Sequence, residues 1–339
     1  MNKLTKIGVS ALCGSLAAVS AANAGEMSVT GGATMTYTQL GYGETGNPLG
    51  MATGLTFTGS GELDNGNKVT LTIAHDDKNT FSAAAVNYEV AGLGTFSFDQ
   101  GGGTGLDRID DMMPTAWEET TGTGVGGGLA TVSGAGGMTD IEWAVSPDML
   151  PDGMTAYISW TPKADGSKSN DKTAGGATGA PVDGAGWDVV VQSTSLVDGL
   201  TAFAGYSTIA QAAGADSDGD RTSHAIGATY AVGSWTLGYQ VSRDNEGHHN
   251  SNTAYYDNTA WGIAFNVSDD LSLSYGEHES TRARSGDTDV TLEASSFQLA
   301  YSMGGASIKI AETDFDNSSY VSTTAGDKDG TTIAVTLAF

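Results

Sequence analysis

Residues 235–242 read WTLGYQVS and alternate large apolar side chains with small or polar ones. In an extended strand, successive side chains point to opposite faces. One face of this strand would carry Trp235, Leu237, Tyr239 and Val241, whereas the other would carry only Thr, Gly, Gln and Ser. A strand with two such different faces is expected to separate an apolar medium from a polar one.

The same alternation recurs from one end of the chain to the other. It is clearest at 69–73, 261–267 and 333–339, where small or polar residues again separate aromatic and aliphatic side chains. Counting such runs predicts sixteen strands. We place them at 26–40, 50–61, 67–76, 79–90, 94–100, 139–147, 154–162, 187–196, 200–211, 221–232, 234–244, 259–268, 271–280, 290–303, 305–315 and 331–339.

Two kinds of connection alternate between these strands. Short links such as 64–66, 91–94 and 198–199 contain the Gly, Asn and Asp residues of tight turns. Longer links rich in Gly, Asn and Asp lie between them, at 41–49, 101–138, 163–186, 212–220, 245–258, 281–289 and 316–330. This order predicts an antiparallel up-and-down meander with all its long loops at one end, and an even strand number places both termini at the other end.

Closing the meander into a barrel removes unpaired sheet edges, which hydrocarbon cannot solvate. Sixteen strands enclose a lumen wide enough for water. Trp and Tyr residues near many strand ends also fit the aromatic girdles of membrane barrels. We therefore predict an all-β transmembrane antiparallel up-and-down β-barrel of sixteen strands, with long extracellular loops and short periplasmic turns. A secreted soluble β-protein, such as an adhesin, is the alternative from another class.

The charge balance excludes other classes of protein. The 339 residues contain 14 Lys and Arg against 40 Asp and Glu, a formal charge of -26. Nucleic acid is therefore not expected as a partner, because phosphate binding needs clustered basic residues. After the first two dozen residues, no stretch approaches the roughly 20 consecutive apolar residues of a membrane-spanning helix, so a helical membrane protein is not expected either.

The first 24 residues have the pattern of a secretory signal peptide. Lys3 and Lys6 precede the apolar run 7–19, and the small residues of 22–24 form a cleavage signal. The domain boundaries are therefore 1–24 for the signal and 25–339 for the barrel. Cys13 is the only cysteine, so the exported chain would form no disulfide.

Three features in order resemble the Gram-negative general porins of the sixteen-stranded trimeric type, particularly those of alphaproteobacteria. They are the first strand beginning EMSVTGGA at 26–33, the long loop after the fifth strand, and Phe339 closing an alternating strand. The resemblance implies a homotrimer in the bacterial outer membrane, reached through the periplasm, that lets small hydrophilic solutes diffuse passively and is not an enzyme. It also implies contact with lipid and lipopolysaccharide, and recognition of Phe339 by the barrel-assembly machinery.

The loop at 101–138 is the candidate constriction. Glycine runs at 101–103 and 122–128 flank it, and 106–119 is expected to form a short helical piece. Its apolar residues Ile109, Met112, Met113 and Trp117 would pack on the inner wall. Similar loops in the porin family fold into the lumen and present acids there. By this resemblance the acidic role in the pore falls on Asp107, Asp110, Asp111, Glu118 and Glu119.

Strand phase predicts the charges of the pore wall. It points Asp99, Glu142, Asp188, Lys309 and Lys68 inward. Basic residues are few, so the basic wall that faces the acidic loop in the porin family would be thin here. An acidic lumen concentrates cations, and we expect the channel to prefer them. A substrate-selective channel built on the same barrel remains an alternative.

Other chemistry is weakly indicated. The acids Asp216, Asp218 and Asp220 alternate as in a calcium loop, but Arg221 occupies the place of the turn glycine. We expect at most loosely bound Ca²⁺ or Mg²⁺ there, and no resident metal or cofactor. The two histidines at 248–249 could contact a metal ion, but the spacing of the sequence places no third ligand beside them.

Overall fold

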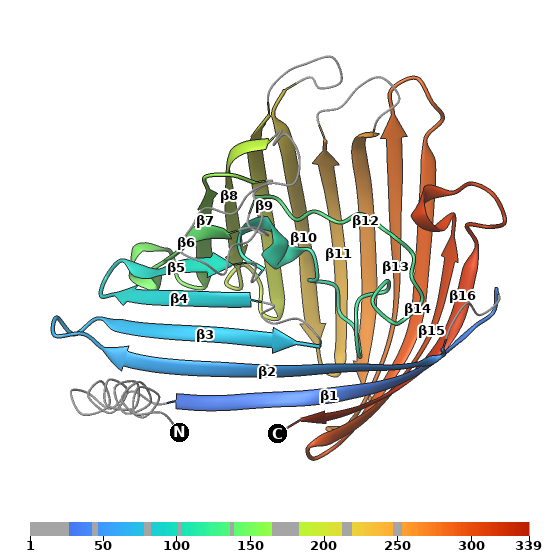
Figure 1. Cartoon of the computed structure of the whole chain (residues 1–339), viewed down its shortest axis with the longest axis horizontal. Helices are drawn as coiled ribbons and strands as arrows, with labels where there is room; N and C mark the ends of the chain where they lie inside the picture. The colour runs from blue at the N-terminus through green and yellow to red at the C-terminus, as the bar shows by residue number, and fades with distance from the viewer. Residues whose placement is uncertain are drawn as a thin grey trace, which may run out of the picture.

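The computed structural model describes residues 27–42, 47–77, 83–100, 103–135, 139–164, 183–211, 219–246 and 253–338. Its strands form one closed antiparallel barrel, in which each strand pairs with its neighbours in sequence and the first pairs with the last (Figure 1). The predicted fold class is therefore confirmed. Among the residues described, no helix is long and apolar enough to cross a membrane.

Sixteen strands build the wall, joined by tight turns at one end and by long loops at the other. Within the described parts of the connections there are three short 3-10 helices: η1 (Gly105–Ile109), η2 (Pro147–Met149) and η3 (Ser318–Tyr320). The strands are β1 (Met27–Leu40), β2 (Leu49–Glu62), β3 (Lys68–Asp76), β4 (Ala83–Val90), β5 (Gly94–Gln100), β6 (Thr139–Val145), β7 (Met154–Thr161), β8 (Asp183–Ser193), β9 (Leu200–Gln211), β10 (Arg221–Val232), β11 (Trp235–Asn245), β12 (Thr253–Asn266), β13 (Leu271–Arg284), β14 (Val290–Met303), β15 (Ala306–Asp316) and β16 (Lys328–Ala338).

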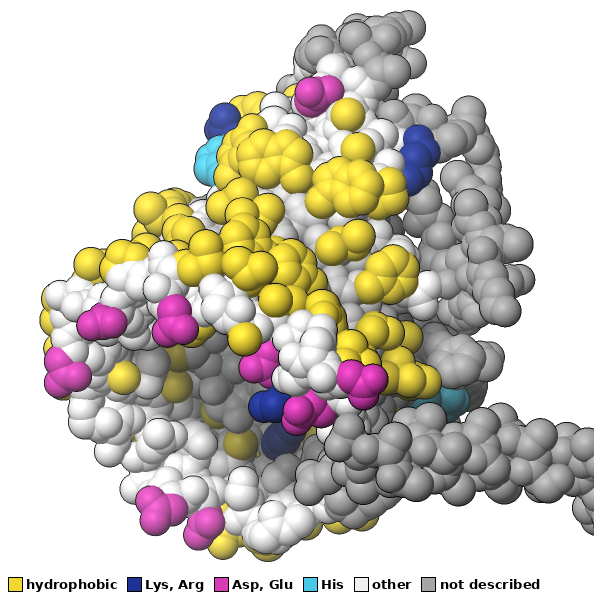
Figure 2. Space-filling view, turned by 90° about the vertical axis from the view of Figure 1, so that its left-hand side faces the viewer, with side chains coloured by type: hydrophobic (Ala, Val, Ile, Leu, Met, Phe, Trp, Pro, Cys, Tyr) yellow, Lys and Arg dark blue, Asp and Glu magenta, His cyan; other side chains and the backbone are white. Residues whose placement is uncertain are grey.

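The two faces of the wall differ as the alternation predicted. On β11, the side chain of Trp235 is 46% exposed on the outside, whereas Gln240 is 4% exposed on the inside. Outward aromatic residues pair across neighbouring strands, as Trp235 and Phe265 do with ring centroids 4.3 Å apart. Figure 2 shows hydrophobic side chains gathered on the outer surface, beside a hollow bordered by polar side chains and several acids. The barrel therefore has an apolar exterior and a polar interior.

Several strands extend further toward the long loops than the alternation indicated. β12 begins at Thr253 rather than 259, β13 ends at Arg284 rather than 280, and β8 begins at Asp183 rather than 187. These extensions contain Asp, Arg and Tyr together with small residues, and they lack the apolar outer face that marks the rest of each strand. Backbone pairing continues there without the apolar pattern, so hydropathy alone ended these strands too early.

The outer face should not tolerate a charge near the middle of a strand. Ile226 is 57% exposed on the outside of β10. In lipid, Ile226→Arg is expected to lower the free energy of unfolding by about 2–4 kcal/mol, the cost of a buried guanidinium at the centre of a bilayer. The matched control is Thr229→Arg, whose side chain has the inward phase of the same strand. The free energy of unfolding of both variants can be measured by urea unfolding in lipid vesicles. A larger loss for Thr229→Arg than for Ile226→Arg would contradict the assignment of the two faces.

Candidate functional site

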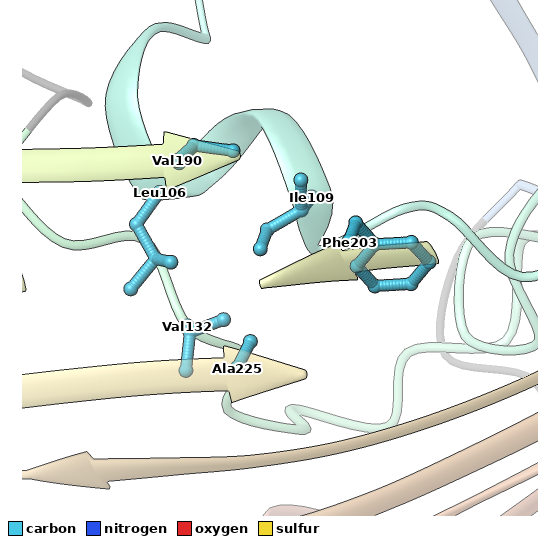
Figure 3. Packing of buried hydrophobic residues seen from close by; sticks show 6 residues of the cluster. All are labelled: Leu106, Ile109, Val132, Val190, Phe203 and Ala225. Carbon is cyan, nitrogen blue, oxygen red and sulfur yellow. The ribbon is translucent and has the colours of Figure 1, made fainter. Parts of the chain in front are cut away.

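Residues 103–135, hereafter the inner loop, leave β5 and pass along the inside of the barrel. Its first turn, η1, buries Leu106 and Ile109 against Val190 of β8 and Phe203 of β9. Figure 3 shows these side chains facing one another, with Val132 of the returning part of the inner loop and Ala225 of β10 beside them. The sequence predicted that Ile109, Met112 and Met113 would pack on the inner wall, and all three belong to this cluster or lie against it.

Asp188 fixes both ends of the inner loop to β8. Its carboxylate accepts hydrogen bonds from the backbone N–H of Leu106 at 2.9 Å and from that of Ala135 at 3.0 Å. The Asp188 side chain is fully buried. Buried N–H groups need acceptors, and a carboxylate provides stronger ones than neutral groups do. One side chain thus anchors the inner loop where it begins and where it ends.

Glu142 of β6 is a second buried anchor. It accepts hydrogen bonds from the backbone N–H of Gly105 at 2.9 Å and from the hydroxyl of Ser159 at 3.0 Å. Arg108 forms an ion pair with the same carboxylate, and its guanidinium lies 3.9 Å from the centre of the Tyr157 ring. The charge of Arg108 is therefore neutralised at the wall.

The far part of the inner loop is clamped by Gln298 of β14. The side-chain oxygen of Gln298 accepts hydrogen bonds from the N–H groups of Trp117 and Glu118, at 3.0 and 3.2 Å. Its amide nitrogen donates to the carbonyl of Glu118 at 2.8 Å. Gln298 is buried on the inner face of β14. Its side-chain amide both accepts from and donates to the loop backbone, as the backbone of a paired strand would.

A row of glycines on the wall lets the inner loop approach closely. Gly238, Gly262 and Gly276 pair with one another across β11, β12 and β13. A Cβ atom at Gly238 would lie 2.4 Å from Cδ of Pro114, and one at Gly262 would lie 2.9 Å from the Pro114 carbonyl oxygen. This row of inward glycines could not be recognised in the sequence, because it becomes apparent only when the register between adjacent strands is known.

Adding a side chain to this row of inward glycines should push the inner loop away from the wall. We expect Gly238→Val to narrow the open lumen and lower single-channel conductance, at a cost in stability of about 1–3 kcal/mol for overpacking. The control is Gly61→Val, because Gly61 has no atom within 4 Å of its Cβ position. Equal conductance of both variants and the parent in planar bilayers would rule out this path of the loop.

The inner loop then reaches the opposite part of the wall and turns back. The Thr123 hydroxyl hydrogen-bonds that of Thr313 on β15, and the N–H of Ala130 donates to the Tyr320 hydroxyl at 3.0 Å. Val125 packs in a second buried cluster with Phe315. Figure 1 shows the green trace of the loop crossing the inside of the sheet, whereas β2, β3 and β4 lie on the other side of the barrel. The strand register gives β2, β3 and β4 polar inward residues such as Thr58, Thr72 and Asn87.

The five acids assigned to the pore belong to the inner loop and lie close enough to repel one another. Partial burial, followed by the charges of Asp111 and Asp107, raises the pKa of Asp110 to about 8. Burial, and then the charge of Asp111, also raises the pKa of Asp107 and Glu119. Burial raises the pKa of Glu118 as well, although Lys309 opposes this effect. The structure therefore brings Asp107, Asp110, Asp111, Glu118 and Glu119 into one electrostatic cluster.

The residues predicted for the pore wall are divided between two environments. Asp99, Glu142 and Asp188 have the inward phase, but they are buried beside or beneath the inner loop. Lys309 of β15 faces inward, with its ammonium group 5.8 Å from the Trp117 ring. Lys68 lies at the tight-turn end, 3.9 Å from Glu89, and is mostly exposed.

One expectation for the inner loop differs from the structure, and several others concern residues that the structure does not describe. Only Gly105–Ile109 is helical, as a 3-10 turn, whereas a helical piece was predicted over 106–119. Pro114 cannot donate a helical hydrogen bond, and the backbone at 116–118 is satisfied by Ser274 and Gln298 instead. Asp216, Asp218, the histidines at 248–249, the signal segment 1–24 and Phe339 lie outside the described residues.

Asp220 is the described member of the predicted calcium loop. Its carboxylate accepts a hydrogen bond from the N–H of Gln211 at 3.2 Å. Across the described ranges, no group of three His, Cys, Asp or Glu side chains is placed to hold a metal ion.

The sequence matches no family model and no curated protein. Solved structures, in contrast, resemble the barrel over nearly its whole length. OmpF of Salmonella typhi, solved in complex with daunomycin, superposes with a TM-score of 0.69 at 15% identity, covering 93% of this chain and 98% of that one. OmpT, an outer membrane protein of Vibrio cholerae, gives 0.67 at 11% identity, with the same 93% and 98% coverage.

An anion-selective porin from Comamonas acidovorans has a TM-score of 0.63 at 14% identity and covers 93% of this chain and 100% of its own. At identities this low, the superpositions establish a shared fold alone. All three superpose on this closed antiparallel barrel over nearly its whole length. The chain therefore has the fold of the outer-membrane porins.

Proposed function

We propose that this protein is a channel of the bacterial outer membrane, through which small hydrophilic solutes and ions diffuse passively. The observation that carries the proposal is the position of the inner loop: it lies along one side of a closed barrel and leaves the polar inner faces of β2, β3 and β4 on the other side. A segment in this position narrows a water-filled lumen without filling it. The exposed apolar outer face favours a membrane over a soluble secreted β-protein.

The charges of the lumen favour cations. Arg108 is paired with Glu142, and Arg221 is paired with both Asp183 and Glu246. In the acidic cluster of the inner loop, in contrast, Lys309 is the one basic group among the described residues that opposes the raised pKa values, and it acts on Glu118. Uncompensated carboxylates in a narrow channel raise the local concentration of cations. This preference would be opposite to that of the Comamonas protein, whose title describes an anion-selective porin.

The direct test is the reversal potential of the purified protein in a planar bilayer. With potassium chloride tenfold more concentrated on one side, we expect a reversal potential whose sign reports greater permeability to potassium than to chloride. A potential of the opposite sign would overturn the cation preference but leave the channel intact. The absence of any conductance from the folded barrel would overturn the channel itself.

The preference should depend on pH near neutrality. Because the pKa of Asp110 is raised to about 8, raising the pH from about 6 to about 9 removes its proton and adds a negative charge to the lumen. Cation selectivity is therefore expected to increase over this range. In an Asp110→Asn variant the increase should be much smaller, and an identical pH profile of the two proteins would assign the titration to another group.

We further propose a homotrimer that is exported through the periplasm and surrounded by lipid and lipopolysaccharide. One similar structure is described as a trimer form of OmpT from Vibrio cholerae, which supports this assembly. Phe339 would then be the signal read by the barrel-assembly machinery. A trimer predicts a heat-sensitive band of about three times the monomer mass in detergent electrophoresis.

A substrate-selective channel built on the same barrel is the alternative to passive diffusion of many solutes. Such a channel would show saturable block of its conductance by one class of nutrient.

A further inference from the structure

A cavity of about 770 Å³ opens at the long-loop end of the barrel. It lies where the β13–β14 connection meets the β15–β16 connection, and none of the five acids of the inner loop lines it. Its lining includes Arg282, Arg284, Asp289, Glu293 and Tyr320, together with several hydroxyl side chains. Its volume falls within the range of about 300–1,000 Å³ that is typical of small-molecule sites.

Arg282 gives this cavity a positive charge that no neighbouring acid neutralises. None of the ion pairs formed within the described residues involves it. Its guanidinium donates to the Tyr320 carbonyl at 3.0 Å and lies 4.8 Å from the centre of the Tyr320 ring. In the same described part of the chain its Nε–H is buried without an acceptor. Such a group favours an anionic partner.

The cavity also carries negative charge. Asp289 lines it without an ion pair among the described residues, whereas Asp287 is 3.4 Å from Arg284 and offsets that charge. A purely anionic solute would lie close to Asp289, and a purely cationic one would lie close to Arg282. A solute with both charges can satisfy both sets of groups at once.

The cavity floor is fixed rather than adaptable. The Tyr320 hydroxyl is bonded to Ser280 at 2.6 Å and accepts from Ala130 at 3.0 Å, so the ring is held between the wall and the inner loop. Asn317, Ser319 and Tyr320 all have left-handed φ angles of 55–58°, which non-glycine residues rarely adopt. Strained backbone of this kind persists where surrounding contacts impose it, and it is concentrated at functional sites.

We propose that this cavity binds small hydrophilic zwitterions, such as short peptides, with the carboxylate toward Arg282 and the ammonium group toward Asp289. Passive diffusion through the barrel does not require such a site. Bound there, a zwitterion would be concentrated at the mouth of the lumen before passage. The proposal depends on the channel only for this consequence, because binding can be measured in detergent whether or not the barrel conducts.

The test is calorimetric titration of the purified protein in detergent with three peptides of nearly equal size. They are triglycine, its C-terminal amide, which is a cation, and its N-acetyl derivative, which is an anion. We expect triglycine to bind at least about tenfold more tightly than either derivative, since each derivative loses one charge-assisted contact. Equal binding of the acetylated anion, or no binding of triglycine, would overturn the proposal.

Two variants locate the site. Arg282→Gln should weaken triglycine binding by about tenfold and abolish the advantage of triglycine over the amide. Asp289→Asn should abolish its advantage over the acetylated peptide, and it provides a second test if Arg282→Gln does not fold. The matched control, Lys309→Gln, removes a basic side chain from the wall elsewhere and should leave binding unchanged. Unchanged affinity in both site variants would place any binding outside this cavity and so overturn the assignment.

Discussion

Replacing Asp188 with alanine is expected to release the inner loop from β8 at both of its ends. The substitution leaves the buried N–H groups of Leu106 and Ala135 without their acceptor. A hydrogen bond to a charged group contributes about 1.5–3 kcal/mol, so the free energy of unfolding should fall by roughly 3 kcal/mol or more. Loss of the anchors should also make the inner loop mobile, which predicts noisy single-channel currents with more than one conductance level.

Asp188→Asn separates the role of the acceptor from that of the charge. The asparagine oxygen can still accept from one N–H group, so this variant should lose less stability than Asp188→Ala and keep a steadier current. Urea unfolding and bilayer recordings of the same preparations measure both effects. If Asp188→Ala unfolds like the parent protein and conducts with a single steady level, the inner loop is not anchored by this carboxylate.

Neutralising the acidic cluster should have the largest effect on selectivity. The variant combines Asp107→Asn, Asp110→Asn, Asp111→Asn, Glu118→Gln and Glu119→Gln. These substitutions remove the negative charges that the inner loop carries between its anchors, while Lys309 remains. We therefore expect the permeabilities of potassium and chloride to become nearly equal, as measured by the reversal potential.

The chain offers a control of equal size on its outer face. Glu277, Glu279, Glu312, Asp314 and Asp316 have the outward phase of β13 and β15. At about pH 9, above the pKa of about 8 for Asp110, neutralising these five changes the net charge of the protein about as much as neutralising the five in the inner loop. Selectivity should nevertheless stay that of the parent. If the outer set shifted the reversal potential as strongly, net charge and not the acidic cluster would determine ion preference.

The barrel could be predicted from the sequence because each strand separates two media. In 235–242, for example, the apolar side chains of Trp235 and Leu237 and the polar ones of Thr236 and Gln240 already specify which face meets lipid. The beginning of β12 could not be predicted in this way, since Tyr255, Tyr256 and Asp257 lie where the pattern of apolar and polar faces ends. Strand ends outside an apolar medium have no hydropathy signal.

The path of the inner loop was only partly predictable. Its apolar residues and flanking glycines indicated an inward course, but its anchors depend on contacts between distant parts of the sequence. Asp188 and Glu142 were predicted to face the pore because strand phase gives the direction of a side chain. Phase cannot show that the inner loop covers both carboxylates. The row of inward glycines at Gly238 and Gly262 likewise depends on the register between strands.

The most direct measurement of the central claim compares two neighbouring cysteine variants, Thr236→Cys and Leu237→Cys, each in a Cys13→Ser background. In a planar bilayer, a membrane-impermeant trimethylammonium thiosulfonate should modify the cysteine at 236 and change the single-channel current. The cysteine at 237, on the outward phase where Leu237 is 43% exposed, should face lipid and stay unmodified. Modification at 237 with protection at 236 would mean that water lies outside this barrel and the apolar medium within it.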